Sequence, residues 1–94
     1  MAAYNYIQDP GHGWIEVPMK EITRLGIAKN ISECSYAKDG NAYLEEDCDA
    51  GVFLEAKKKA HEECEIEGVE VESTDIREYQ RFVHTELYRE AMRS

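Results

Sequence analysis

The sequence predicts an α+β fold in which two ββα units, a final strand and a final helix form one antiparallel or mixed sheet packed against helices. Two observations predict it. Short aromatic and β-branched runs flank glycine-containing turns, while other stretches repeat apolar residues at helical spacing. One series of residues also occurs twice, because residues 6–9 and 14–16 align with 36–39 and 43–45 at offsets of 30 and 29 residues. We interpret this as an internal pseudo-repeat.

The first unit is predicted over residues 4–25. Residues 4–8 and 14–17 are rich in aromatic and β-branched side chains and predict two strands. The sequence Asp-Pro-Gly-His-Gly between them predicts a turn, because proline fixes φ and glycine accepts positive φ. Pro18 suits the start of a helix, and Gly26 followed by an isoleucine suits its end.

The second unit is predicted over residues 34–56. Residues 33–37 and 41–45 predict a hairpin, because Asp-Gly at residues 39–40 is a strong hairpin signal. A helix is expected from about residue 49 to residue 65. Its apolar stripe would be Val52, Phe53, Ala56, Ala60 and Cys64.

The last strand and helix are predicted from a shorter stretch of sequence. Residues 69–72 alternate apolar and acidic side chains, as a half-buried strand does. Thr74 or Asp75 would cap a third helix, because Asp75 and Glu78 have the spacing of a capping box. The buried face of that helix would carry Ile76, Tyr79, Val83, Leu87 and Ala91.

Length and composition predict one domain over residues 1–94, with a core over about 4–82 and a helical extension over 83–94. The first residues lack the basic start and apolar run of a signal peptide, and no segment approaches the ~20 apolar residues of a membrane span. We therefore expect a cytoplasmic protein with no membrane partner. Three cysteines without CxxC spacing predict free thiols, interpreted as small buried hydrophobes: Cys34, Cys48 and Cys64.

The charge is concentrated in one part of the chain. Residues 45–78 hold thirteen acidic and four basic side chains, so the whole net charge of −9 lies there. Such a field disfavours binding to nucleic acid or membrane surfaces and favours a basic partner. A solvated surface that aids solubility is the alternative.

Several groups of side chains could carry chemistry, and each has a simpler structural explanation. Asp9 and His12 share a turn and could act as an acid–base pair, but such an Asp more often orders the turn through its backbone and leaves the His exposed. Trp14, Tyr36 and Tyr43 could stack on a nucleobase or nucleotide, but without a basic groove we interpret them as core residues. A cation could bind Glu45, Glu46, Asp47 and Asp49, although EF-hand spacing is missing. His61 and Cys64 lie one helical turn apart, but a zinc site needs more ligands. We expect no catalytic residue, no metal and no cofactor.

Four segments in combination resemble a group of small bacteriophage and prophage proteins. They are DPGHGWIEV at residues 9–17, LGI at 25–27, YLEEDCDA at 43–50 and IREYQRF at 76–82. The resemblance covers roughly residues 4–82 and carries no settled activity, so it transfers no catalytic residue. It implies a phage context, in which small acidic proteins often inhibit host defence, as anti-CRISPR and anti-restriction proteins do.

These observations lead to one functional hypothesis and two alternatives. The hypothesis is a monomeric or homodimeric interaction protein in the host cytoplasm that inhibits a nucleic-acid-handling defence complex, with its acidic face mimicking nucleic acid. Its expected partner is a basic host protein or nucleoprotein complex, with no direct binding of nucleic acid. The alternatives are a ligand-binding or hydrolytic protein using the loop of Asp9, His12 and Trp14, and a structural or accessory phage protein. The predicted partner-binding residues are Glu45, Glu46, Asp47, Asp49, Glu62, Glu63, Glu65, Glu67, Glu70 and Glu72.

Overall fold

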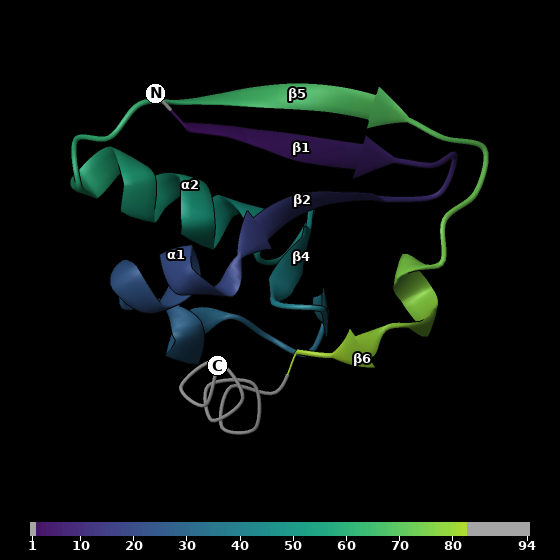
Figure 1. The fold of residues 1–94 in the computed structure, drawn as a ribbon, viewed down its shortest axis with the longest axis horizontal. Helices are drawn as coiled ribbons and strands as arrows, with labels where there is room; N and C mark the ends of the chain where they lie inside the picture. Colours follow the sequence, from purple (N-terminus) through teal and green to yellow (C-terminus); the bar gives the residue numbers. More distant parts are fainter. Residues whose placement is uncertain (1, 83–94) are drawn as a thin grey trace.

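A mixed β-sheet with helices against one of its faces forms the body of the protein (Figure 1). The computed structural model describes residues 2–82, and within them the sheet has six strands in the order β5-β1-β2-β4-β3-β6. The strands are β1 (Ala2–Gln8), β2 (Gly13–Pro18), β3 (Tyr36–Lys38), β4 (Asn41–Glu45), β5 (Cys64–Glu70) and β6 (Gln80–Arg81). The helices are α1 (Met19–Arg24) and α2 (Ala50–Lys59), with 3-10 turns at Ala28–Asn30 and Ile76–Glu78. The predicted α+β class is confirmed.

The alternation of side chains along the central strands builds two apolar layers. On one face Ile15, Val17 and Leu44 pack with Ile22 of α1 and Phe53 of α2 in the main core. On the other face a smaller cluster contains Trp14, Tyr36, Tyr43 and Ile76. The prediction that the three aromatic residues of this cluster belong to the core is confirmed, since each is at most 8% exposed.

The register of the two central strands follows the predicted pseudo-repeat. Ile15 pairs with Leu44, the residue that is aligned with it in the other unit. On either side of this pair, Trp14 pairs with Glu45 and Glu16 pairs with Tyr43. These pairs are the ones that a two-fold axis between β2 and β4 would generate. Both hairpins therefore lie in one sheet with their helices on one face. The two units differ in the connection from strand to helix. The helix α1 follows β2 directly, whereas residues 46–49 separate β4 from α2.

Two turn predictions are confirmed by backbone geometry. Asp39 and Gly40 have φ values of 51° and 84°, as a two-residue hairpin turn of the I′ type requires. Gly26 has φ of 68° and donates to the carbonyl of Thr23, while Ile27 donates to the carbonyl of Ile22. These two bonds form the Schellman arrangement that closes a helix.

The second helix is shorter than predicted, and the strand after it, β5, begins earlier in the sequence than predicted. The helix ends at Lys59 instead of residue 65, and β5 is Cys64–Glu70 instead of residues 69–72. Three lysines occupy the last turn of α2, where positive charge is favourable, whereas glutamates follow at 62, 63 and 65 and would be unfavourable at a helix C-terminus. Pairing β5 in parallel with β1 along its whole length satisfies the backbone of these residues instead.

The predicted third helix is wrong within the described residues. Asp75 and Glu78 form only a 3-10 turn, in which Glu78 N–H donates to the Asp75 carbonyl at 2.8 Å. Tyr79 is already extended, and the chain continues into β6, where residue 80 pairs with Ala37. This path lets Ile76 fill the aromatic cluster and Phe82 reach the main core. The remaining predicted helical positions, Val83, Leu87 and Ala91, lie outside the described residues.

The interpretation of the cysteines as buried hydrophobes is wrong for Cys34 and Cys48, which are exposed. Cys64 is half-buried and packs against the main core, and all three cysteines are free thiols. The reason is their position, since Cys34 and Cys48 occupy turns outside the strands that face the two apolar layers. None of the helices formed by residues 2–82 combines the length and the apolar character that crossing a bilayer requires.

Candidate functional site

The acidic residues predicted to bind a partner occupy four different environments. One is buried, one is neutralised by basic neighbours, three gather with a histidine, and the others line an open edge of the sheet. The same residue type therefore serves different purposes at different positions.

Asp49 is buried and holds two turns together. It is 3% exposed, and its carboxylate accepts hydrogen bonds from Ser32 N–H at 3.1 Å and from Ser32 Oγ at 2.8 Å. The Ser35 hydroxyl donates to the same carboxylate. Asp49 is consequently not part of the acidic surface to which it was assigned, because its oxygens point to internal donors.

Glu62 belongs to a charge network between α1, α2 and the start of β5. Its carboxylate accepts hydrogen bonds from Arg24 at 2.6 and 2.7 Å and from Lys57 at 2.9 Å. The hydrogen bond from Arg24, followed by that from Lys57, lowers the pKa of Glu62 to about 2. Lys57 is itself buried and donates to the hydroxyl of Tyr4. Glu62 is thus matched by positive charge and contributes little to a negative field.

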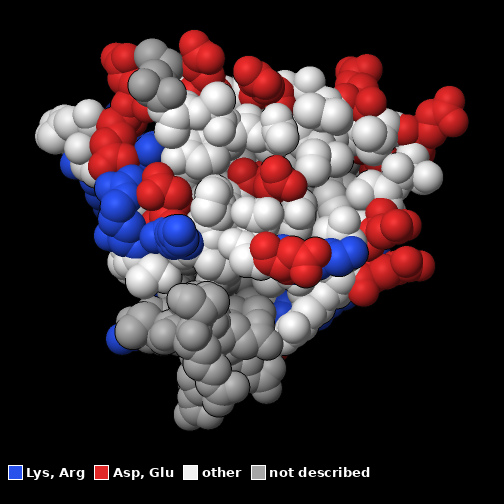
Figure 2. Space-filling view, in the orientation of Figure 1, with Lys and Arg blue, Asp and Glu red and all other residues white. Residues whose placement is uncertain are grey.

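Five of the predicted partner-binding residues lie on or beside the edge strand β5 and are not neutralised. We define the acidic edge as five exposed residues that form no ion pair with any other described residue: Glu63, Glu65, Glu67, Glu70 and Glu72. Figure 2 shows acidic side chains along the upper border, where β5 lies, and basic side chains gathered at the left. Glu65 and Glu67 project from one face of the sheet and Glu70 from the other, because strand side chains alternate. Both faces of this edge are negative.

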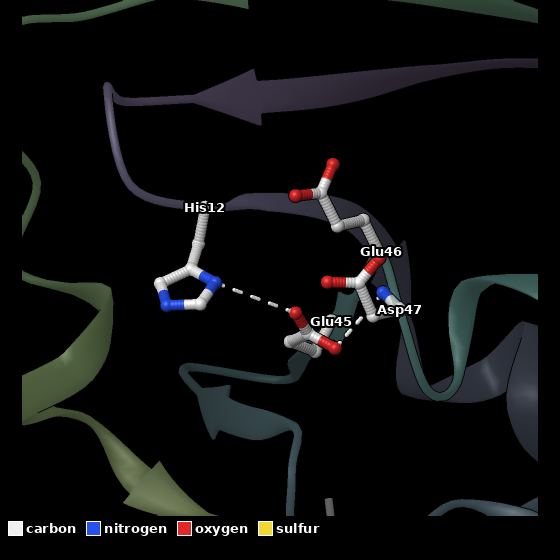
Figure 3. Close-up of side chains that lie close together, drawn as sticks. All are labelled: His12, Glu45, Glu46 and Asp47. Atoms are coloured by element: carbon white, nitrogen blue, oxygen red, sulfur yellow. Dashed lines mark hydrogen bonds and ion pairs between the residues drawn. The ribbon is translucent and has the colours of Figure 1, made fainter.

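A second group of carboxylates surrounds a histidine at the end of β4. His12, Glu45, Glu46 and Asp47 place one ligand-type atom each within 4.8 Å of one another (Figure 3). His12 Nδ1 lies 3.6 Å from Glu45 Oε1, and Glu45 also accepts from the Asp47 N–H at 2.9 Å. The Tyr6 hydroxyl donates to Glu46, and this bond raises the pKa of Tyr6.

This His12 cluster combines three carboxylates with one imidazole, a donor set that a divalent cation could accept. Two of the carboxylates already have partners within the chain, namely Glu45 and Glu46. Asp49, which the predicted cation site included, belongs to the buried hydrogen-bond network instead. The cluster adds negative charge to the same end of the sheet as the last residue of β5, because Gln8 pairs with both Glu70 and Gly13.

The alternative in which Asp9 and His12 act as acid and base is not supported, because the two side chains do not pair. Asp9 Oδ1 accepts from the backbone N–H of Gly11 at 2.9 Å and of His12 at 2.8 Å, which orders the turn. Arg77 binds the same carboxylate, and this hydrogen bond is the largest cause that lowers the pKa of Asp9. With its side chain 5% exposed and its oxygens occupied, Asp9 has no free oxygen to activate the imidazole, which faces Glu45 instead.

Trp14, the third residue of the predicted ligand loop, is enclosed by the structure. Its side chain is 1% exposed and lies under the Arg77 guanidinium, 4.9 Å from the ring centre. Its indole N–H has no hydrogen-bond partner among the described residues. The loop therefore offers His12 to solvent but not Trp14, so it does not form an open aromatic ligand site.

Two features of this region were missed by sequence reasoning. The contact between His12 and Glu45 joins residues 33 positions apart, and no local pattern signals it. The role of Arg77 could have been suspected, because it is the one basic residue after Lys59 in the acidic stretch of residues 45–78. An isolated cation within such a stretch suggests a specific carboxylate partner, and that partner is Asp9.

Comparison with known proteins finds no matching family model, curated protein or solved structure. Interpretation of the site therefore depends on geometry and charge.

Proposed function

We propose that the protein is an acidic interaction module that binds a basic surface through the acidic edge, and that its target is a nucleic-acid-handling defence complex of a phage host. The supporting observation is the unequal neutralisation of its carboxylates. Glu62 and Asp9 are each held by arginine, whereas the five residues of the acidic edge have no ion pair within residues 2–82. Charges left unpaired in this way remain available to another molecule.

The geometry of β5 suits an extended basic surface. Alternate residues of a strand lie ~6.6 Å apart, so Glu65 and Glu67 form a short linear row on one face. A DNA strand likewise presents negative charges at regular intervals, one for each ~3.4 Å of helix axis. A channel that binds nucleic acid through lysine and arginine could accept such a row.

The position of β5 adds a backbone contribution to the proposed interaction. It is the outermost strand of the sheet, with β1 on one side and no other described strand on the other. An outer strand presents free backbone N–H and C=O groups to a partner. Exposed glutamates on this strand also oppose self-association of two such edges, because like charges would meet. The edge would thus favour basic partners over copies of itself.

The link to host defence depends on the resemblance to phage proteins and on the charge. An inhibitor that occupies a basic nucleic-acid channel needs negative charge, a rigid support and no catalytic residue. The sheet supplies the support, and the acidic edge with the His12 cluster supplies negative charge at neighbouring positions. The loop of Asp9, His12 and Trp14 receives less support as a hydrolytic site, because Asp9 and Trp14 are occupied or enclosed.

The experiment is a binding competition with purified host CRISPR effector complexes and restriction nucleases. Binding of the chain is measured at two salt concentrations, with and without duplex DNA as competitor. We expect one of these effectors to bind the chain at low salt and to release it at high salt. Binding of the chain and binding of DNA to this effector should exclude each other. The variant Glu65→Lys with Glu67→Lys and Glu70→Lys should weaken this binding by about tenfold or more.

A charge-matched variant distinguishes the edge from net charge. The control variant reverses three exposed glutamates outside the acidic edge, by Glu33→Lys, Glu55→Lys and Glu78→Lys. Its net charge changes by the same amount. We expect this variant to retain most of the binding. Equal losses in both variants would show that only net charge matters, and simultaneous binding of DNA and the chain would contradict the mimic.

A further inference from the structure

One buried carboxylate joins the two turns that carry Cys34 and Cys48. Asp49 accepts hydrogen bonds from Ser32 and Ser35, which lie on either side of Cys34 in the chain. Cys34 N–H donates to Ser32 Oγ at 3.1 Å, and Cys48 directly precedes Asp49. The Ser35 hydroxyl also accepts from the N–H of Glu45 at 3.1 Å. This network holds together the two turns that carry the cysteines.

Both cysteines lie at the surface of the protein, on turns that the Asp49 network holds together. Both residues are exposed, so small reagents in solution can reach them. The hydrogen bond with Cys34 is the largest cause that raises the pKa of the Cys48 thiol to about 12, followed by burial and the Glu45 carboxylate. The side chains of Cys34 and Cys48 are therefore close enough to influence each other.

We propose that Cys34 and Cys48 form a reactive dithiol that small disulfides oxidise to an intramolecular disulfide, which makes this pair of turns a reversible modification site. The bond would connect the turn before β3 to the turn between β4 and α2. Asp49 acts as a positioning residue, because it holds both turns without touching the reacting sulfurs.

The reaction with oxidised glutathione proceeds by two exchanges. The Cys34 thiolate attacks one glutathione sulfur, forming a mixed disulfide and releasing one glutathione thiolate. Cys48 then loses its proton to solvent and attacks the Cys34 sulfur, which expels the second glutathione thiolate. The protein loses two electrons and two protons, and the oxidised glutathione becomes two molecules of reduced glutathione.

The third cysteine is too distant to compete within one molecule. Cys64 begins β5 and pairs with Ala2, whereas the Cys48 turn follows Glu45, which pairs with Trp14 beside the far end of β1. The length of β1, seven residues, corresponds to ~20 Å of extended strand. A disulfide bridges Cα atoms that are ~4.4–6.8 Å apart. Closure through Cys64 would therefore require the sheet to open.

The test uses the full-length protein, fully reduced and then equilibrated with mixtures of reduced and oxidised glutathione. Samples are acid-quenched, alkylated and analysed by intact mass and peptide mapping. We expect a species lighter by two hydrogens in which Cys34 and Cys48 are linked. Cys64→Ser should leave this species unchanged, and Cys34→Ser should abolish it and leave glutathione adducts only.

A second measurement reports on the reduced pair without oxidation. Phenylarsine oxide bridges two neighbouring thiols and releases one water, so Cys64→Ser should bind one equivalent and Cys48→Ser should lose this binding. Circular dichroism confirms that each variant is folded. A linkage through Cys64, stable glutathione adducts on both cysteines without closure, or no stoichiometric arsenical binding would each overturn the proposal.

Discussion

Arg77 donates two hydrogen bonds to the carboxylate of Asp9, at 2.7 and 3.2 Å, across 68 residues of sequence. The same guanidinium lies over the ring of Trp14 at 4.9 Å. Arg77 belongs to the segment between β5 and β6, so this contact fastens that segment over the aromatic face of the sheet. One side chain thereby orders the loop after β1 and covers the tryptophan.

Replacing Arg77 with alanine should expose Trp14. Because the chain has one tryptophan, its fluorescence reports on this site alone. We expect Arg77→Ala to red-shift the emission and to increase quenching by acrylamide. Arg77→Lys should restore little of the change, because an ammonium cannot reproduce the two-pronged contact with a carboxylate.

Arg81→Ala provides the matched control for this prediction. Arg81 also lies over an aromatic ring, that of Tyr36 at 4.8 Å, but it does not cover Trp14. Its removal should leave tryptophan emission unchanged. Equal quenching in both variants would show that loosening of the whole segment, and not the Arg77 contact, controls exposure of the ring.

Replacing Asp49 with alanine should destabilise the protein by about 1–3 kcal/mol, because the donors of Ser32 and Ser35 lose their buried acceptor. Urea unfolding followed by circular dichroism measures the change. Asp47→Ala is the control, since the Asp47 side chain is exposed and the expected change is within about 0.5 kcal/mol. Equal effects of the two substitutions would contradict a special role for Asp49.

Acid should weaken the network between α1 and α2. The hydrogen bond from Arg24 is the largest cause that lowers the pKa of Glu21 and of Glu62, each from 4.5 to about 2. Both carboxyls bind protons more weakly in the folded than in the unfolded chain. Their stabilising contribution is thus present above about pH 4.5 and is lost as the pH falls towards 2.

Thermal unfolding between pH 2 and pH 6 measures this effect. Arg24→Gln should lower the melting temperature near pH 6 and flatten its dependence on pH, because both carboxyls then titrate closer to their ordinary values. Lys20→Gln, an exposed change of equal charge on the same helix, should keep the wild-type slope. A slope unaltered by Arg24→Gln would assign the acid sensitivity to other carboxyls.

Local turn chemistry explains why much of the fold could be predicted. Asp39-Gly40 and Gly26 determine their own backbone conformations through positive φ, so the second hairpin and the end of α1 follow from neighbouring residues. The pseudo-repeat then predicts that Ile15 and Leu44 occupy equivalent positions, and the sheet pairs them directly. Such features depend on few residues and little on the rest of the chain.

The position of β5 could not be predicted in the same way. Its pairing with β1 joins Tyr4 to Ile66, residues 62 apart, and no turn connects the two strands. The positive φ of His61, which accompanies the end of α2, also has no clear signal in the sequence.

The negative charge of the candidate site could be predicted. Which of its acidic residues are buried, neutralised or exposed could not. The clustering of acidic residues is visible in the sequence, whereas the burial of Asp49 and the neutralisation of Glu62 depend on distant serines and cations. The two serines three residues apart, Ser32 and Ser35, are a weak signal of a buried acceptor. The proximity of Cys34 to Cys48 follows only once that acceptor is known.

The parallel pairing of β5 with β1 has a consequence for synthesis on the ribosome. β1 emerges first but keeps one open edge until residue 70 has left the exit tunnel, because its outer neighbour is Cys64–Glu70. Both hairpins and both helices can form earlier from contacts nearer in sequence. During that interval the open edge of β1 presents unpaired backbone N–H and C=O groups without the glutamates that will later flank it. The nascent chain is therefore most prone to mispairing just before its acidic segment arrives, and a stop within residues 60–70 should yield a chain that aggregates.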